Sequence, residues 1–233
     1  MAKAPRPGRS KTRLCPPLRP EDAASLSGAF LRDTTRTIAR AGREAPISPY
    51  AAYAPAGDED LVAAHMAPGT SLLLADGSSP APADVVGFGR CLLQAIESML
   101  ARGHPAACVL SSDVPTLPAR LLVEAARHLL APGDRAVLGA CPDGGYYILG
   151  LKAAHSRMFS DIAWSTERVA EQTRERAREI GLDLVELDPW YDVDDAVSLS
   201  LLLSESTDDR CPATRAVIDR LKLHETVALR QSA

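Results

Sequence analysis

Short apolar runs alternate with helical patterns along most of the chain, and this alternation constrains the fold more than any other feature. Apolar runs of four to eight residues predict buried strands, and apolar residues spaced three and four apart predict amphipathic helices. The predicted strands are 47–54, 71–75, 107–111, 135–140, 146–151 and 183–187, and the predicted helices are 20–42, 58–66, 85–102, 118–129, 165–180, 196–203 and 217–229. Strands that alternate with helices predict an α/β fold with a mainly parallel sheet and helices on both faces.

One connection between predicted strands departs from this alternation. Only a short segment with the sequence Asp143-Gly144-Gly145 separates strand 135–140 from strand 146–151. Parallel neighbours need a crossover of a dozen or more residues, and a short glycine turn leaves no room for one. Strand 146–151 can therefore run antiparallel to its neighbour.

Composition and charge exclude several classes of protein. Hydrophobic residues make up 46% and charged residues 24% of the 233 residues, which is ordinary for a globular chain and unlike a disordered or fibrous one. The net charge of −4 gives no attraction of the whole molecule to nucleic acid or to an anionic membrane. No apolar run approaches the ~20 residues that span a bilayer, and the N-terminus lacks the apolar core of a secretory signal. We therefore expect a cytoplasmic protein.

The cysteines do not indicate a covalent or metal framework. There are five of them, widely spaced along the chain, and none forms a Cys-x-x-Cys pair: Cys15, Cys91, Cys108, Cys141 and Cys211. An odd number without paired spacing predicts neither a disulfide framework nor a zinc site.

Charge is distributed unevenly. Residues 1–20 contain six lysines and arginines and no acid, whereas residues 183–195 contain six aspartates and glutamates. In the basic segment, Pro5 and Gly8 can shape a tight loop, Lys11 offers a point charge, and Arg13 offers a bidentate fork for a di- or triphosphate. The alternatives are a solvated basic tail or a transit peptide, although five prolines in the first twenty residues oppose the helix that transit peptides form.

Three acidic positions fit a divalent cation. Asp113 follows a predicted buried strand, where ligands bind in open α/β sheets, and hard cations such as Mg²⁺ prefer oxygen ligands. Asp192 and Asp194 share one side of an extended segment and repel each other unless a cation lies between them. The alternatives are that Asp113 caps the helix or turn that follows it, and that Asp194 or Asp195 caps helix 196–203.

The glycine turn is the third loop that can reach a ligand. Gly144 and Gly145 permit positive φ angles and close backbone approach, but Asp-Gly-Gly is equally a hairpin turn. Asp143 is our candidate to orient or deprotonate an acceptor hydroxyl group.

Several motifs occur in a fixed order along residues 3–200. They are Lys-x-Pro-x-Pro-Gly-x-x-Lys-Thr-Arg-Leu at 3–14, Ser-Asp-x-Pro-Thr-Leu at 112–117, Asp-Gly-Gly-Tyr-Tyr-x-x-Gly-Leu at 143–151, Trp-Ser-Thr at 164–166 and Asp-Val-Asp at 192–194. In these motifs the chain resembles the bacterial glycosyltransferase-A-like proteins that carry a domain of unknown function. Its basic first loop is also similar to that of phospholactate guanylyltransferase.

The resemblance implies the nucleotide-diphospho-sugar transferase fold, and we assign residues 1–203 to a nucleotide-binding domain of this fold. The helical pattern near the end of the chain predicts a C-terminal helical extension over residues 204–233. Relatives carry an apolar strand ahead of the Lys-x-Pro motif, whereas only Met1 and Ala2 precede it here. Either translation begins upstream of Met1 or the first strand is truncated.

The resemblance also implies roles for individual residues. Those implied to contact nucleotide phosphates are Lys3, Pro5, Gly8, Lys11 and Arg13. Those implied to hold Mg²⁺ or Mn²⁺ are Asp113, Asp192 and Asp194, with Asp113 and Asp143 serving catalysis. Those expected on the acceptor side are Gly144, Gly145, Tyr146, Trp164, Ser165 and Thr166. The alternative for this last group is that Trp164 packs in the core and Ser165 caps the next helix.

Three functions remain open at this point. The first is metal-dependent glycosyl transfer from a nucleotide sugar to a small acceptor. The second is nucleotidyl transfer from a nucleoside triphosphate to a small phosphorylated acid, because fold alone does not separate the two reactions. The third is nucleotide binding without turnover, since relatives carry an Asp-Leu-Gly-Glu-Arg-like segment where this chain has residues 87–91. The C-terminal helix can pack on its own domain or on a second subunit, so a homodimer is also open.

Overall fold

The strands form two neighbouring sheets in the computed structural model, which describes residues 1–205 and 210–225. The first sheet has the order β1 (Ala2–Lys3), β2 (Tyr50–Ala54), β3 (Ser71–Leu74), and all its pairs are parallel. The second has the order β4 (Ala107–Leu110), β6 (Tyr146–Leu151), β5 (Arg135–Ala140), β7 (Asp183–Glu186). Strand β6 is antiparallel to both neighbours, as its short glycine turn predicted, and β5 pairs with β7 in parallel.

The first strand explains why there are two sheets rather than one. Strand β1 pairs only its two residues with Tyr53 and Ala54 of β2. Beyond it, the amino group of Met1 donates a hydrogen bond of 2.5 Å to the carbonyl oxygen of Leu110 in β4. A mainly apolar cavity of about 180 Å³ lies between the remaining edges of β2 and β4. The first strand therefore pairs with β2 over two residues and reaches β4 only through the Met1 amino group, so the two sheets are not joined by a continuous ladder.

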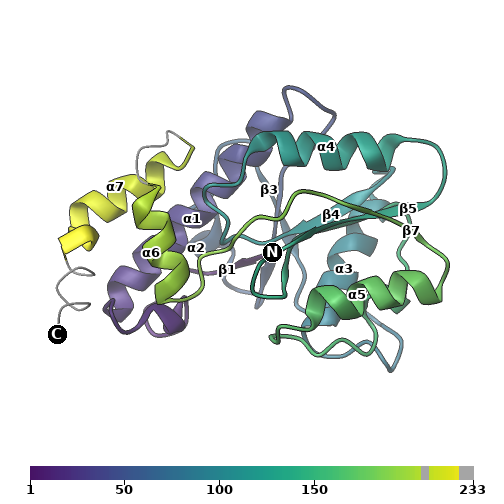
Figure 1. Ribbon diagram of the computed structural model, residues 1–233, viewed down its shortest axis with the longest axis horizontal. Coiled ribbons are helices and arrows are strands. Elements are labelled where there is room, and N and C mark those ends of the chain that lie inside the picture. The colour runs from purple at the N-terminus through teal and green to yellow at the C-terminus, as the bar shows by residue number, and fades with distance from the viewer. Residues whose placement is uncertain (206–209, 226–233) are drawn as a thin grey trace.

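Helices cover both faces of the sheets, as the alternating pattern predicted (Figure 1). They are α1 (Pro20–Ala41), α2 (Glu59–Ala63), α3 (Phe88–Ala101), α4 (Ala119–Leu130), α5 (Val169–Glu179), α6 (Ala196–Ser204) and α7 (Pro212–Leu221), with the 3₁₀ turns η1 (Thr12–Leu14) and η2 (Ser156–Phe159). Helices α1 and α4 lie on one side of the sheets and α3 and α5 on the other. Among the described residues, no helix has both the length and the apolar character to cross a membrane.

Strand β5 shows how the two faces are specified. Its residues Ala136 and Leu138 belong to the buried cluster that includes α3 residues, whereas Val137 belongs to the cluster formed with α4. Side chains alternate between the two faces of a strand, and here both faces are apolar because both are covered.

Several helix boundaries differ from the prediction: α3 begins at Phe88 rather than at 85, α2 ends at Ala63 rather than at 66, and the starts of α5 and α7 differ most. Helix α5 begins at Val169 rather than at 165, because Ser165 has a φ of +66° and Thr166 donates its hydroxyl hydrogen to the Ala163 carbonyl. Ser165 therefore does not cap this helix. Helix α7 begins at Pro212 rather than at 217, and residues 226–229 of that predicted helix lie outside the described residues.

The C-terminal helix α7 packs on α1 through one buried acid. Asp33 is fully buried, and its carboxylate accepts the backbone N–H groups of Ala213 (3.0 Å) and Thr214 (2.7 Å) at the start of α7. Burial raises the pKa of Asp33 and outweighs the opposing effect of these hydrogen bonds. Further along, Ile218 packs in a buried cluster with Phe30 of α1. The division at residue 204 stays a prediction.

Removal of the Asp33 carboxylate tests this connection. Asp33→Ala leaves two N–H groups at the start of α7 without their acceptor, so the free energy of unfolding should fall by about 1–2 kcal/mol. Urea denaturation measures the change. Asp33→Asn keeps one acceptor oxygen and should lose less; equal stability of the alanine variant and the wild type would show that the cap contributes nothing.

Candidate active site

A cleft of about 1180 Å³ opens beyond the carboxyl ends of several strands. Its wall includes Lys3 at the end of β1, Asp113 after β4, Asp143 after β5 and Asp192 in the segment that follows β7. In α/β sheets this is the edge at which ligands bind. The cleft volume is at or slightly above the range usual for small-molecule sites, about 300–1,000 Å³.

Lys11 lies between two of the carboxylates expected to hold metal. Its ammonium nitrogen is 2.6 Å from Asp113 Oδ2, and it also forms an ion pair with Asp194 Oδ1. The Lys11 side chain is only 6% exposed, and its nitrogen lies 5.9 Å from the centre of the Phe30 ring. The three residues come from the first loop, the middle and the far end of the chain, so the fold brings together charges that are distant in the sequence.

The charge of Lys11 is maintained by its partners. Burial is the largest single influence on the pKa of Lys11, and it lowers that pKa. The negative charges of Asp113 and Asp194 and their hydrogen bonds together outweigh burial, so the pKa of Lys11 is raised above its ordinary value. The side chain is therefore an ammonium ion.

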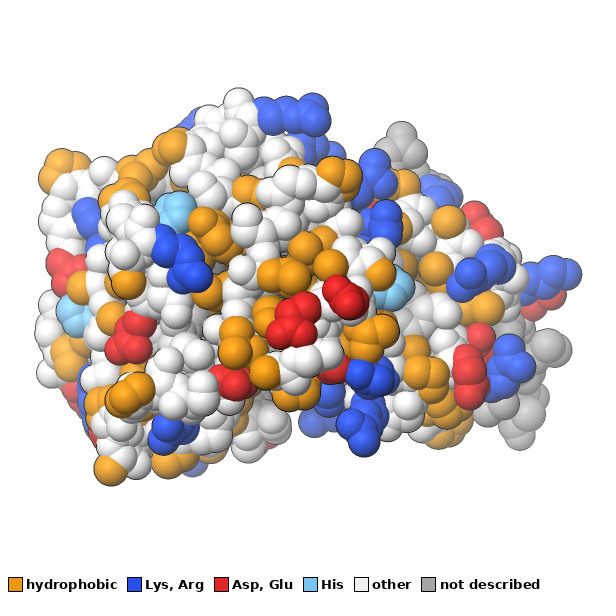
Figure 2. All heavy atoms as spheres, turned by 180° about the vertical axis from the view of Figure 1, so that it is seen from behind, with side chains coloured by type: hydrophobic (Ala, Val, Ile, Leu, Met, Phe, Trp, Pro, Cys, Tyr) orange, Lys and Arg blue, Asp and Glu red, His pale blue; other side chains and the backbone are white. Residues whose placement is uncertain are grey.

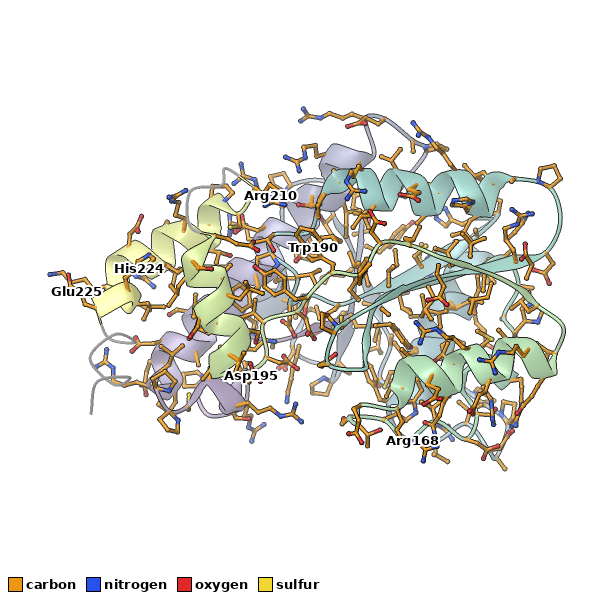
Figure 3. The ribbon with its side chains drawn as sticks, in the orientation of Figure 1. Arg168, Trp190, Asp195, Arg210, His224 and Glu225 are labelled. Carbon is orange, nitrogen blue, oxygen red and sulfur yellow. The ribbon has the colours of Figure 1, made fainter. Side chains whose placement is uncertain are left out.

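Asp195 is the N-cap residue of α6, whereas neither Asp113 nor Asp194 is the N-cap of the helix that follows it. Asp195 begins α6 and accepts the backbone N–H of Ser198 at 2.8 Å, completing a capping box (Figure 3). The Ser198 hydroxyl also accepts the backbone N–H of Asp194 at 3.0 Å, which orients the residue that reaches Lys11. Helix α4 has Pro118 at its N-cap and no side-chain cap, so Asp113 is not its cap.

The segment after β7 carries Asp192 and Asp194 to the site by following the strand ends. The backbone N–H of Leu187 donates to Leu138 at 2.9 Å, and that of Trp190 donates to Ala140 at 3.2 Å, both at the end of β5. Val193 N–H then donates to the carbonyl of Asp113 at 2.9 Å. In Figure 3, Trp190 lies in this crossing segment, with Arg210 nearby.

Asp192 lies with a different set of partners from Asp194. Ligand atoms of Cys141, Asp143 and Asp192 all lie within 4.8 Å of one another. Burial, followed by repulsion from Asp194 and Asp143, raises the pKa of Asp192 to about 7. Burial, followed by the negative charges of Asp192, Asp143 and Asp194, also raises the pKa of Cys141. Sequence reasoning missed Cys141, although its position directly after a predicted strand was a usable signal.

The remaining candidate residues divide into two groups. Those on the cleft wall are Lys3, Arg13, Gly145, Tyr146, Trp164, Ser165 and Thr166. Those that do not line it are Pro5, Gly8, Lys11 and Gly144. Gly144 instead accepts the backbone N–H of Ala170 at 2.9 Å and so links the turn to α5. Asp143 Oδ1 accepts the N–H of Gly145 at 2.9 Å. The Asp-Gly-Gly segment therefore also forms the hairpin turn that the sequence allowed.

Apolar side chains that the sequence did not single out complete the cleft. Phe88 lies edge-on to Trp164, with ring centres 5.8 Å apart, and both line the cleft. Val197 and Leu201 of α6 also line it, and Val197 is 78% exposed. Trp164 also packs against the buried cluster that includes α3, so it contacts both the core and the cleft.

A divalent cation fits the acidic end of this cleft. The Lys11 ammonium shows that Asp113 and Asp194 can converge on one positive charge, and it stands in for such an ion. Carboxylate oxygens suit Mg²⁺ and Mn²⁺, which take few ligands from protein when phosphate supplies others.

Substitution of Lys11 tests whether it holds the two carboxylates together. Lys11→Met leaves two facing carboxylates without their cation. Breaking a buried pair costs about 3–5 kcal/mol, and because both acids are partly exposed we expect a loss of about 2 kcal/mol. Thermal unfolding measures it, and Mn²⁺ should stabilise the variant more than the wild type. The exposed Arg9→Met is the control; an unchanged melting temperature in Lys11→Met would contradict the expectation.

On one face of the molecule, the charged side chains of the described residues are mixed in sign. On the face shown in Figure 2, lysines and arginines lie singly or in small groups among acidic and hydrophobic side chains. An anionic ligand is therefore better matched by the cleft, where Lys3 and Arg13 are on the wall.

Comparisons with known proteins agree with this fold. The family model described as "Uncharacterized protein conserved in bacteria (DUF2064)" matches residues 37–166. The crystal structure of a candidate nucleotide-diphospho-sugar transferase from Desulfovibrio desulfuricans G20 is similar over 98% of this chain and 94% of that chain, with 25% sequence identity and a TM-score of 0.82. No curated protein matches the chain. The chain belongs to the DUF2064 family of bacterial proteins and has the fold of a nucleotide-diphospho-sugar transferase.

Proposed function

We propose that this protein is a glycosyltransferase that moves a sugar from a nucleotide-diphospho-sugar donor to a small acceptor, with Mg²⁺ or Mn²⁺ as cofactor. The observation that carries the proposal is the convergence of Asp113 and Asp194 on one positive charge beside a cleft of about 1180 Å³. The similarity to a candidate nucleotide-diphospho-sugar transferase supports a transferase in general.

The donor would be held at the charged end of the cleft. Lys3 and Arg13 line this end and can bind phosphate oxygens, Arg13 by a bidentate fork. Asp113 and Asp194, with Asp192 nearby, would hold the cation, which supplies positive charge for the diphosphate leaving group. Lys11 occupies this point as an ammonium ion, so the cation would take its place between the two carboxylates.

The acceptor would approach past Asp143. This carboxylate is exposed, lines the cleft, and is fixed by the N–H of Gly145, so it can orient an acceptor hydroxyl or accept its proton. Side chains on the same wall would position the acceptor: Tyr146, Trp164, Ser165 and Thr166.

Ligand screening with the purified protein tests the proposal without knowledge of the acceptor. We expect one nucleotide sugar, in the presence of Mn²⁺, to raise the melting temperature and to release nucleoside diphosphate slowly as water replaces the acceptor. Release of pyrophosphate from a nucleoside triphosphate would instead identify a nucleotidyltransferase. Stabilisation by nucleotides with no product, even with mixed small acceptors, would identify a binding protein without turnover.

A further inference from the structure

We propose that Cys141, Asp143 and Asp192 form a binding site for a thiophilic divalent cation such as Zn²⁺, separate from the Asp113–Lys11–Asp194 bridge. One sulfur and two carboxylate oxygens, one from each residue, lie within 4.8 Å of one another. Ligands around one zinc ion are about 3.5 Å apart, given Zn–S and Zn–O distances of about 2.3 and 2.1 Å. Rotation of the two carboxylates can close the remaining difference.

The position of the Cys141 thiol, close to two carboxylates, suits a metal ligand better than an ordinary core side chain. Cys141 is buried, with 6% of its surface exposed. Within residues 1–205 and 210–225, the thiol donates no hydrogen bond, although two carboxylates lie close to it. Cys141 also packs in the apolar cluster formed with α4, but apolar packing does not account for two carboxylates beside its sulfur.

The two carboxylates also lack a cation of their own. Lys11 is paired with Asp113 and Asp194, and in the part of the chain that the structure describes neither Asp143 nor Asp192 forms an ion pair with a lysine or arginine. Neighbouring carboxylates repel each other unless positive charge lies between them. A divalent cation would compensate both at once.

The ligand set selects the kind of metal. Thiolate sulfur favours zinc and similar ions, whereas Mg²⁺ and Ca²⁺ require oxygen ligands. Three protein ligands leave a fourth position of tetrahedral zinc for water or a substrate. Asp143 and Asp192 both line the cleft, so a ligand in the cleft is close to the proposed ion. On binding, the sulfur–hydrogen bond of Cys141 is replaced by a sulfur–metal bond, and the proton passes to solvent.

This inference does not rest on the proposed glycosyl transfer, and a spectroscopic titration tests it directly. The reduced, metal-free, full-length protein is titrated with Co²⁺, which substitutes for Zn²⁺ and gives a sulfur-to-metal charge-transfer band only when a thiolate is bound. We expect one such band per chain, its loss on addition of Zn²⁺, and its persistence in excess Mg²⁺.

Two cysteine variants locate the ligand. Cys141→Ser should abolish the band and weaken Co²⁺ binding at least about tenfold. Cys91→Ser is the matched control, because Cys91 lines the same cleft but lies outside the cluster, and it should keep the band. Absence of the band in the wild type, its survival in folded Cys141→Ser, or its displacement by Mg²⁺ as readily as by Zn²⁺ would overturn the proposal.

A carboxylate variant keeps the test decisive if Cys141→Ser does not fold. Asp143 is exposed, so Asp143→Asn should fold, and it retains the thiol while removing one charged ligand. Its Co²⁺ affinity should fall at least about tenfold. Wild-type affinity in this variant would mean that Asp143 is not a ligand and that the site as proposed is wrong.

Discussion

Asp113→Asn should lower metal-dependent release of nucleoside diphosphate from the donor at least about 100-fold, because removal of one preorganised electrostatic group commonly costs that much. Asparagine keeps the shape of the side chain but removes the charge that pairs with Lys11 and that would hold the cation. Turnover with Mn²⁺ and Mn²⁺ affinity are the two measurements, and both should fall together.

The control for this variant is an acid outside the cleft. Asp188 is exposed and pairs with Arg120 on the surface, so Asp188→Asn should leave turnover and Mn²⁺ affinity unchanged. Melting temperatures of both variants separate a loss of activity from a loss of folded protein. Full turnover in folded Asp113→Asn would remove the metal site from the proposed mechanism.

Gly144→Ala should destabilise the protein by about 2–5 kcal/mol, the second large effect that we expect. Gly144 has a φ of +89°, where an L side chain costs about 1–2 kcal/mol. A Cβ atom there would also lie 1.9 Å from the carbonyl oxygen of Glu167, so the backbone of one segment must move, at a further cost of about 1–3 kcal/mol. Chemical denaturation measures the loss.

A second glycine separates these two causes. Gly8 has a similar φ of +71°, but beyond its chain neighbours no atom lies within 4 Å of the place that a Cβ atom would occupy. Gly8→Ala should therefore show the conformational cost alone, about 1 kcal/mol. Equal losses in the two variants would mean that the approach of Gly144 to Glu167 does not restrict the turn that carries Asp143.

Sequence patterns correctly predicted the elements whose conformation depends on residues close to them in the sequence. Strands β5 and β6 begin and end at the predicted residues, and the short turn between them predicted their antiparallel pairing. The start of α5 was predicted wrongly because Ser165 has a φ of +66° and Thr166 bonds back to Ala163, so the helix begins only beyond them. At the start of the helix, Ala170 donates its backbone N–H to Gly144, a contact between residues distant in the sequence.

The sequence by itself determined the α/β class, most of the helices and strands, and the presence of acids and cations at strand ends, because periodicity and turn residues act over a few positions. Only the tertiary structure decided how these charges are paired. Asp194 meets Lys11 and Asp113, whereas Asp192, two residues earlier, meets Asp143 and Cys141. The strand order and the path of the segment after β7 set these pairings, and they depend on contacts between residues more than 40 positions apart.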